Sequence, residues 1–222
     1  ASALAAAERP LVITSTQHRD AEILEASLEV LEALQARNGT QPWFAMSVSE
    51  ANTLGVSLLN DRQGMSVTSV IHAIETGEVS ALIVVENDLF ERHEDHRHLA
   101  DSLKRLDVLV VLDHMVTATS SLGTHTFPAA TVPESNGTLI NSEGRIQRFY
   151  QVLRPAEEVV PSWNTVGNII AAIGQEKEGR WQHFEEVTAA IETSHPLFSG
   201  MMKVAPPAGF RLNHQSIPRM SQ

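Results

Sequence analysis

The sequence contains no cysteine. This absence excludes disulfides, thiolate catalysis and cysteine-ligated zinc or iron–sulfur centres within its 222 residues. No segment reaches the roughly 18 consecutive apolar residues that a membrane-spanning helix needs, and the first ten residues lack the basic and apolar regions of a signal peptide. We therefore expect a soluble protein and, because the sequence does not begin with Met, a fragment of a longer one.

Basic residues are scarce. Lys and Arg number 16 against 27 Asp and Glu, which gives a formal net charge of −11. A phosphate backbone is repelled by such a chain unless its basic residues cluster on one face, and the sequence has no such cluster. Nucleic-acid binding is therefore not expected.

Glycine is missing where a nucleotide-binding turn would need it. The segment 14–19 that follows the first expected strand holds no glycine, so Gly-x-Gly-x-x-Gly is absent there, and the chain has no P-loop. The residues that would bind a dinucleotide phosphate are not present.

The sequence does hold an alternation of short apolar strands and amphipathic helices. Strands are expected at 11–16, 43–48, 81–85 and 108–112, with a weaker fifth at 125–130. Helices are expected from Asp20 to Asn38-Gly39, from Ser66 to Thr76-Gly77, around Leu99 to Leu106, from Ser162 to Gly174, and around Phe184 to Ile191. This order predicts an α/β fold with a doubly wound, mostly parallel sheet.

The same pattern predicts two parts in the chain. Residues 1–155 form the α/β domain, and residues 156–222 form a helical appendage whose tail, from His195 through Pro206-Pro207, is extended. In doubly wound sheets, ligands bind where loops leave the carboxyl ends of the strands. Those loops here are Glu86–Leu89 and Asp113–Thr119.

One cluster of possible metal ligands is His93-Glu94-Asp95-His96-Arg97-His98. On a helix, His93 with His96, or Glu94 with His98, would share a face and could bind a metal. The alternative, which we favour, is a solvated first helical turn before Leu99, because Arg92 and Arg97 interrupt the cluster.

A second group of reactive side chains follows the fourth strand. Ser120 and Ser121 lie near His114 and His125 in sequence, but no glycine-flanked nucleophile elbow accompanies them. Asp113 is either a base or metal carboxylate or, as is more common, a cap for the next turn. We assign no catalytic, cofactor-binding or metal-binding residue from these patterns.

A long polar segment, 127–149, contains the turn signals Asn136-Gly137 and Glu143-Gly144 and ends with Arg145 and Arg148. Long irregular segments within compact domains are uncommon and often functional. We expect an irregular loop here.

This segment carries a resemblance to a known family. Phe127-Pro-Ala-Ala followed by Glu134-Ser-Asn-Gly-Thr-Leu-Ile-Asn-Ser-Glu-Gly-Arg-Ile-Gln147 resembles the molybdopterin oxidoreductase hallmark, a Leu-Pro-Ala-Ala loop followed by Glu-x-x-Gly-Thr-x-x-Asn-x-Glu-Gly-Arg-x-Gln. The preceding strands agree in order and spacing, and the similarity covers residues 66 to 155. The resemblance implies that segment 127–149 is inherited from the part of the family's domain that lies beside the pterin.

Three short sequences in this chain are closer to those of one group of family members than to those of formate dehydrogenases or nitrate reductases. They are Glu86-Asn-Asp-Leu, Asp113-His and Gln147-Arg-Phe-Tyr-Gln151. They resemble the large peripheral-arm subunit of respiratory complexes that carry electrons from NADH to a quinone. The resemblance implies iron–sulfur clusters in an N-terminal region outside this cysteine-free chain, other peripheral-arm subunits as partners, and a position on the cytoplasmic face of the inner membrane.

The chain also departs from catalytic members of the family. Those usually have Gly-x-Asn-Pro after the third strand, where this chain has Val85-Glu86-Asn87-Asp88, and Thr-Glu-Thr where it has Thr117-Ala118-Thr119. They commonly have Ala-Asp-Val-Val-Leu-Pro where it has Gly123-Thr-His-Thr-Phe-Pro128.

A β-branched residue in place of glycine fills space that a phosphate would need. We therefore expect no cofactor in this fragment and a segment at 127–149 that is braced by hydrogen bonds of Asn136, Gly137, Asn141, Glu143 and Arg145. Two alternatives remain: a cofactor-binding fragment of an active molybdopterin enzyme such as a formate dehydrogenase, and a stand-alone small-molecule binding module.

Overall fold

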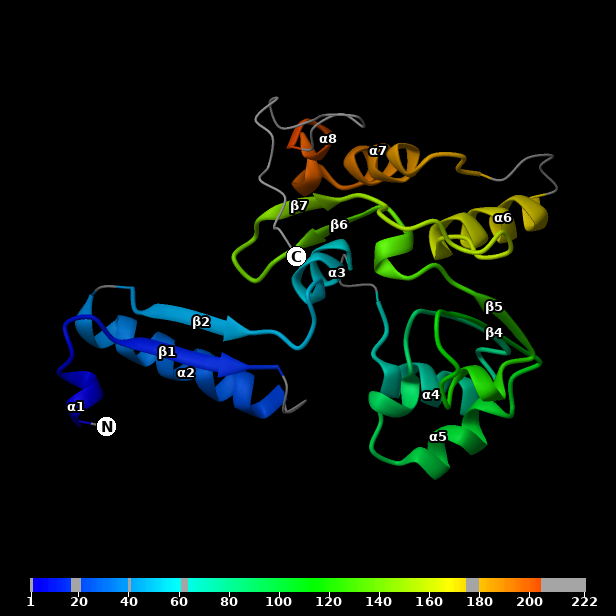
Figure 1. The fold of residues 1–222 in the computed structure, drawn as a ribbon. Helices are drawn as coiled ribbons and strands as arrows, with labels where there is room; N and C mark the ends of the chain where they lie inside the picture. The colour runs from blue at the N-terminus through cyan, green and yellow to red at the C-terminus, as the bar shows by residue number, and fades with distance from the viewer. Residues whose placement is uncertain (1, 17–20, 40, 61–63, 175–179, 205–222) are drawn as a thin grey trace, which may run out of the picture. The chain divides into compact units, whose positions relative to one another are not determined.

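A computed structural model of the chain describes residues 2–16, 21–39, 41–60, 64–174 and 180–204 (Figure 1). The chain divides into two compact units, which we describe separately. One unit holds the residues up to Gly64 together with Thr138–Gln147, and the other holds Met65–Gly137 together with the residues from Arg148 onwards. The predicted boundary between residues 155 and 156 concerns a different division and stays a prediction.

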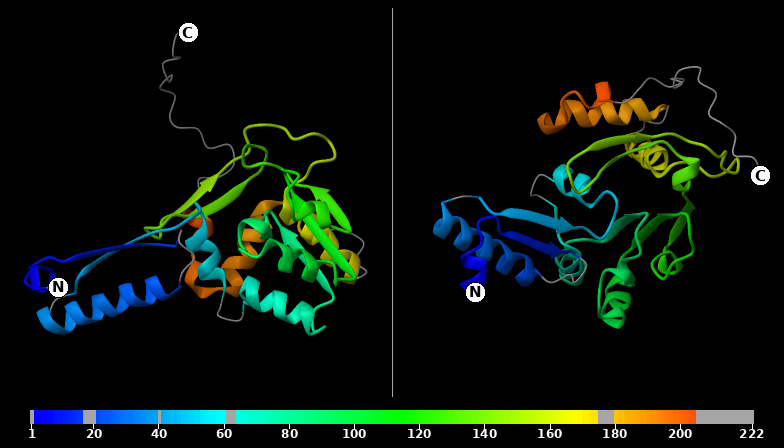
Figure 2. Two further views of the ribbon diagram at one scale, coloured as in Figure 1. Left: turned by 90° about the horizontal axis from the view of Figure 1, so that it is seen from below. Right: turned by 60° about the vertical axis from the view of Figure 1, so that its left-hand side comes forward.

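The first unit contains a two-stranded parallel sheet. Strand β1 (Leu11–Ser15) pairs with β2 (Trp43–Ser47) in register from Leu11 opposite Trp43 to Ser15 opposite Ser47. Helix α2 (Ala21–Asn38) connects the strands and runs beside them in each view (Figure 2). It ends as predicted, because Gly39 takes a φ of +66° and its N–H bonds to the Gln35 carbonyl. The predicted start at Asp20 lies outside the described residues.

Two short helices complete this unit. Helix α1 (Ser2–Ala5) precedes β1, and α3 (Thr53–Leu59) follows β2. The side-chain oxygen of Asn52, at the start of α3, accepts a hydrogen bond from the Ile140 N–H at 2.9 Å. This contact ties the start of α3 to a segment 88 residues further along the chain.

The second unit is built on a three-stranded parallel sheet. Strands β3 (Ala81–Val85), β4 (Val108–Asp113) and β5 (His125–Pro128) lie in that order. Register places Val85 beside Leu112 and Leu112 beside Phe127. The predicted α/β class with parallel strands is confirmed. The described strands form separate parallel sheets, β1-β2 and β3-β4-β5, because β1 pairs only with β2 among them.

Helices α4 (Val67–Glu75) and α5 (His96–Leu103) cover one face of this sheet (Figure 1). The Ser66 hydroxyl caps α4 by accepting from the Ser69 N–H, and Gly77 ends the helix with a φ of +78°. The buried core between helices and sheet is aliphatic, and its members are Ile71, Ile74, Val84, Leu99, Leu103, Leu109 and Val111. Four single-turn segments, η1 (Leu89–Glu91), η2 (Ser120–Leu122), η3 (Val132–Glu134) and η4 (Pro196–Phe198), also belong to this unit.

The segment 127–149 is more regular than predicted. Strands β6 (Gly137–Ile140) and β7 (Ile146–Phe149) form a two-stranded sheet. Because only five residues join the strands, they run antiparallel, as a hairpin. The expectation of an irregular loop is wrong here: the turn signals at Asn136-Gly137 and Glu143-Gly144 flank and close a hairpin.

Helices follow the hairpin. Helix α6 (Ser162–Gly174) ends at the predicted glycine, and α7 (Phe184–Ser194) and α8 (Met201–Val204) come after it. The predicted extended tail is wrong between His195 and Val204, where the chain forms η4 and α8, and the rest of that tail lies outside the described residues. No helix in the described part of the chain is long and apolar enough to cross a membrane.

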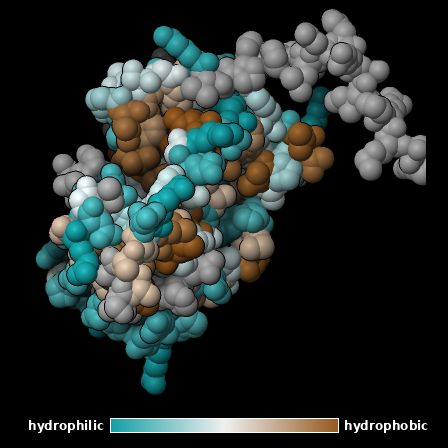
Figure 3. All heavy atoms as spheres, turned by 90° about the vertical axis from the view of Figure 1, so that its left-hand side faces the viewer, coloured by the Kyte–Doolittle hydropathy of each residue, from teal (hydrophilic) through white to brown (hydrophobic). Residues whose placement is uncertain are grey.

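Apolar side chains also reach the surface, as one face of the molecule shows (Figure 3). Val116, Ile173 and Val152 are the most exposed of the large hydrophobic residues, at 93%, 78% and 77%.

Candidate functional site

The candidate site is the carboxyl end of the sheet β3-β4-β5, where parallel strands deliver their following loops to one edge. The strands remain hydrogen-bonded up to this edge. The Glu86 N–H donates to the Leu112 carbonyl at 2.7 Å, and the Ala129 N–H donates to the Asp113 carbonyl at 3.0 Å. The two predicted loops, Glu86–Leu89 and Asp113–Thr119, therefore begin side by side.

Asp88 and Thr119 join these two loops. The Thr119 hydroxyl donates to the Asp88 carboxylate at 2.6 Å, and the Thr119 N–H donates to the same oxygen at 3.3 Å. In return, the Thr119 hydroxyl accepts from the Leu89 N–H at 2.8 Å. Thr119 is fully buried, so both loops are fixed by a contact between residues 31 positions apart.

The electrostatics of Asp88 follow from these bonds. Burial alone would raise the pKa of this carboxyl. Hydrogen bonds from the Thr119 hydroxyl and from the Phe90 N–H outweigh burial and lower the pKa below its ordinary value. The carboxylate is therefore held in its charged form by neighbours in its own domain.

Glu86 has a backbone conformation that glycine adopts more easily. Its φ is +48°, in the left-handed region, which costs a non-glycine residue roughly 1 kcal/mol. Its carboxylate accepts a hydrogen bond from the buried Ser162 hydroxyl at 2.5 Å, across 76 residues. Val85, the position where the family usually has glycine, lies inside β3, so the unusual backbone is one residue further on.

Asp113 caps the turn that follows β4. Its side chain is 4% exposed, and one carboxylate oxygen accepts from the Met115 N–H at 3.1 Å and lies 3.4 Å from Nδ1 of His114. This geometry is the capping role, one of the two alternatives considered for Asp113.

Ser120 and Ser121 act in the same turn. The Ser120 hydroxyl accepts from the Thr117 N–H at 2.8 Å, and both serine hydroxyls donate to the Thr117 carbonyl. In the described residues, neither serine is hydrogen-bonded to His114 or His125. The structure therefore does not assemble a nucleophile with its base here.

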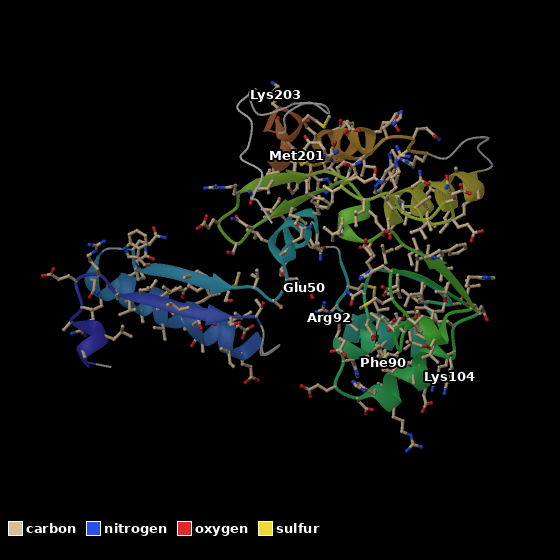
Figure 4. All side chains as sticks on the ribbon, viewed as in Figure 1. Glu50, Phe90, Arg92, Lys104, Met201 and Lys203 are labelled. Atoms are coloured by element: carbon tan, nitrogen blue, oxygen red, sulfur yellow. The ribbon has the colours of Figure 1, made fainter. Side chains whose placement is uncertain are left out.

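The histidine cluster forms the start of α5. Asp95 caps the helix by accepting from the His98 N–H at 2.9 Å, and this bond lowers the pKa of Asp95. His93 bonds the Asp95 carbonyl, and the His96 ring packs edge-on against Phe90, which is labelled in Figure 4. No group of three potential ligands converges on a metal position among the residues that the structure describes. As the favoured alternative predicted, Asp95 caps α5 and His96, Arg97 and His98 form its first turn, whereas His93 and Glu94 precede the helix.

The sequence did not indicate the partners of His98. Its Nε2 lies 2.5 Å from the carboxylate of Glu75 at the end of α4, and the buried Ser102 hydroxyl donates to the same oxygen at 2.9 Å. The hydrogen bond from Ser102, followed by that from His98, lowers the pKa of Glu75. The group ties α4 to α5.

Arg148 is the most enclosed cation of the hairpin region. Its side chain is 8% exposed, its guanidinium lies 3.0 Å from the Glu185 carboxylate, and its central carbon lies 4.0 Å from the Phe184 ring centre. Tyr150 flanks it at 5.3 Å. The sequence offered no signal for this contact, since Glu185 follows 37 residues later.

The predicted bracing of the hairpin is confirmed for its two asparagines. The Asn141 side chain accepts from the N–H groups of Glu143 and Arg145 at 3.1 and 2.9 Å, and the Asn136 side chain accepts from the Gln151 N–H at 3.0 Å. The Arg145 side chain itself is exposed.

An apolar cavity of about 210 Å³ lies between α4, α5 and β3. Its lining contains no ionisable residue, and its one polar member, Asn87, accepts a hydrogen bond from Nε of Arg92 at 3.3 Å. The cavity belongs to the aliphatic core and offers no group for acid–base chemistry.

Sequence comparisons place these features in a family. Residues 1–172 match molybdopterin oxidoreductase, and this chain belongs to that family. The match extends well beyond residues 66 to 155, which carried the resemblance in the sequence.

The chain is also similar to individual proteins named as the G subunit of NADH-quinone oxidoreductase. It is 35% identical to the one from Shewanella oneidensis over 224 residues, 34% identical to that of Pseudomonas fluorescens over 226, and 32% identical to that of Salmonella typhimurium over 222. These alignments cover 98 to 99% of this chain and 24% of each relative. The chain thus spans about a quarter of the length of the curated relatives it matches.

Proposed function

We propose that this chain is a structural and interaction region of the large peripheral-arm subunit, the G subunit, of an NADH-quinone oxidoreductase. The observation that carries the proposal is the bond between Asp88 and Thr119, which joins the two loops at the carboxyl end of the sheet. At this edge, where an α/β domain ordinarily binds its ligand, polar groups of the protein form hydrogen bonds with one another.

The residues at this edge do not fit the phosphates of a pterin dinucleotide. Asp88, Asp113 and Glu86 place three carboxylates at the ends of β3 and β4, which would repel an anionic ligand. Backbone that must approach a phosphate closely needs glycine, and the segment 86–89 has none. The region therefore keeps the scaffold of a cofactor domain without its ligand.

Electron transfer would then use iron–sulfur clusters in a part of the polypeptide outside this cysteine-free stretch. The partners would be the other peripheral-arm subunits, with the arm on the cytoplasmic face of the membrane. The names of the relatives and the match over nearly the whole chain support this assignment.

Elemental analysis and pterin fluorescence of the full-length subunit test the proposal. Expression should take place in a host that makes the pterin cofactor, and a formate dehydrogenase from that host serves as the positive control. We expect neither molybdenum, tungsten nor pterin in the subunit. Stoichiometric metal with pterin would overturn the proposal.

The family match also favours a second candidate, a fragment of an active molybdopterin enzyme such as a formate dehydrogenase. The flanking gene sequence distinguishes the two. The second candidate requires a catalytic molybdenum ligand after a cluster-binding N-terminal region, whereas the peripheral-arm subunit requires the clusters without that ligand.

A further inference from the structure

The apolar cavity between α4, α5 and β3 reaches the surface at the outer edge of the sheet. It touches four consecutive residues of β3, 82–85, and the side chains of a strand point alternately to opposite faces. A cavity that contacts all four therefore passes around the edge of the strand. Among the described strands β3 has a neighbour on one side only, and Ile83 and Val85 are 44% and 42% exposed. A molecule can thus enter the cavity from solvent at this edge.

The volume of the cavity is that of a ligand site rather than of a packing defect. It is about 210 Å³, whereas native interiors hold few voids larger than a water molecule. An engineered apolar cavity of about 150 Å³ in another protein stays dry and binds benzene. The space beside β3 is therefore large enough for a molecule with one six-membered ring and a small substituent.

The lining excludes a charged ligand. Every lining residue except Asn87 is Val, Ile or Leu. An ionised group would lose its water there without gaining a partner. A polypeptide segment also fits poorly, because each of its residues brings a backbone donor and acceptor, and Asn87 alone among the lining side chains can form a hydrogen bond. The chemistry of the lining thus favours a small neutral molecule.

Asn87 specifies one polar feature of that molecule. Its side-chain oxygen accepts a hydrogen bond from Nε of Arg92 at 3.3 Å, and this bond orients the amide. In the part of the chain that the structure describes, the amide nitrogen of Asn87 has no hydrogen-bond partner. An amide N–H only donates, so a matching ligand carries an acceptor such as a carbonyl oxygen.

We propose that this cavity is the binding site of a neutral, ring-sized apolar molecule whose single acceptor bonds to the Asn87 amide. The proposal goes beyond the proposed function and is independent of it, since the site requires neither a pterin nor a partner subunit.

Isothermal titration calorimetry of the full-length subunit tests the proposal with acetophenone, which joins one ring to one carbonyl group. Benzoate, which has nearly the same shape but is anionic, is the matched control. We expect acetophenone to bind as one molecule per chain and benzoate to bind at least about tenfold more weakly. Equal affinity for the two probes would overturn the proposal. An absence of acetophenone binding would also overturn it, and is the result expected if a polypeptide segment fills the cavity.

Two substitutions locate the binding site. Val70→Phe fills the cavity from α4 and should abolish acetophenone binding, whereas Val116→Phe, at a position that is 93% exposed, should not. Asn87→Ala should weaken acetophenone binding by roughly three- to tenfold and leave the binding of toluene, which has no acceptor, unchanged. Unchanged toluene binding also shows that this variant keeps its cavity. Acetophenone binding that persists in Val70→Phe, or an equal effect of Asn87→Ala on both probes, would contradict the proposal.

Discussion

The guanidinium of Arg148 lies over the ring of Phe184, 4.0 Å from its centre, and one of its nitrogens lies 3.0 Å from the carboxylate of the next residue, Glu185. A strand of the hairpin is thereby attached to the first turn of α7. Negative charge in the first turn of a helix is already favourable, so Glu185 serves both the helix and the arginine.

Replacement of Arg148 should therefore destabilise the fold. Arg148→Ala removes the ring contact and the ion pair from a side chain that is largely buried, and we expect a loss of about 1–3 kcal/mol in the free energy of unfolding. Arg148→Lys should recover only part of this loss, because an ammonium lacks the planar stacking surface. Urea denaturation measures both. Arg145→Ala, at an exposed site, is the matched control and should change stability by less than about 0.5 kcal/mol.

The contact between Asp88 and Thr119 predicts a pH dependence. The pKa of Asp88 is lowered in the folded state, so its stabilising effect is fully present above the unfolded value, about 3.9, and is lost as the pH falls through the folded value. Stability curves from pH 7 to pH 2.5 should thus fall more steeply for the wild type than for Asp88→Asn. Parallel stability curves for the wild type and Asp88→Asn would contradict a lowered pKa of Asp88 in the folded state. Thr119→Val should weaken the dependence, because it removes the hydroxyl donor.

The backbone of Glu86 predicts an order among its variants. Glu86→Ala loses the bond to Ser162 and keeps the unfavourable positive φ, whereas Glu86→Gly loses the bond but relieves the backbone. We expect the glycine variant to be more stable than the alanine variant by roughly 1 kcal/mol. Thermal or urea denaturation of the pair decides this, and the reverse order would show that the residue does not keep this conformation.

The three histidines at the start of α5, His93, His96 and His98, should not act as a metal site. Addition of Zn²⁺ or of a chelator is expected to leave the melting temperature unchanged, since a metal that binds only the folded state would raise it. His93→Ala should leave that result the same. A zinc-dependent rise that disappears in His93→Ala would contradict the interpretation.

Local sequence signals predicted the elements of the fold well. Continuous apolar runs identified β3 and β4, the Ser66 hydroxyl marked the start of α4, and Gly39 marked the end of α2. These signals depend on residues within one or two turns of each other. The hairpin at 137–149 was missed because each of its strands has only four residues, and Gly137 and Phe149 come together only through pairing.

The candidate site was predictable in location but not in its contacts. The rule for parallel sheets placed it after β3 and β4, and the changed family motifs pointed to Glu86 and Asp88. Their hydrogen-bond partners, Thr119 and Ser162, lie 31 and 76 residues away in the sequence. No sequence periodicity predicts a contact between residues so far apart in the chain. The position of the candidate site in the sheet follows from local sequence patterns, whereas the hydrogen bonds between side chains at the sheet edge depend on the tertiary structure.

The bond between Ser162 and Glu86 has a consequence for biogenesis. It connects the start of α6 to the end of β3, so the sheet edge is completed by the domain's own later sequence once the ribosome has made it. In the proposed role, this domain could mature without waiting for delivery of a pterin. Its cellular abundance would then be independent of molybdate in the growth medium, in contrast to enzymes whose folded state is stabilised by the bound cofactor.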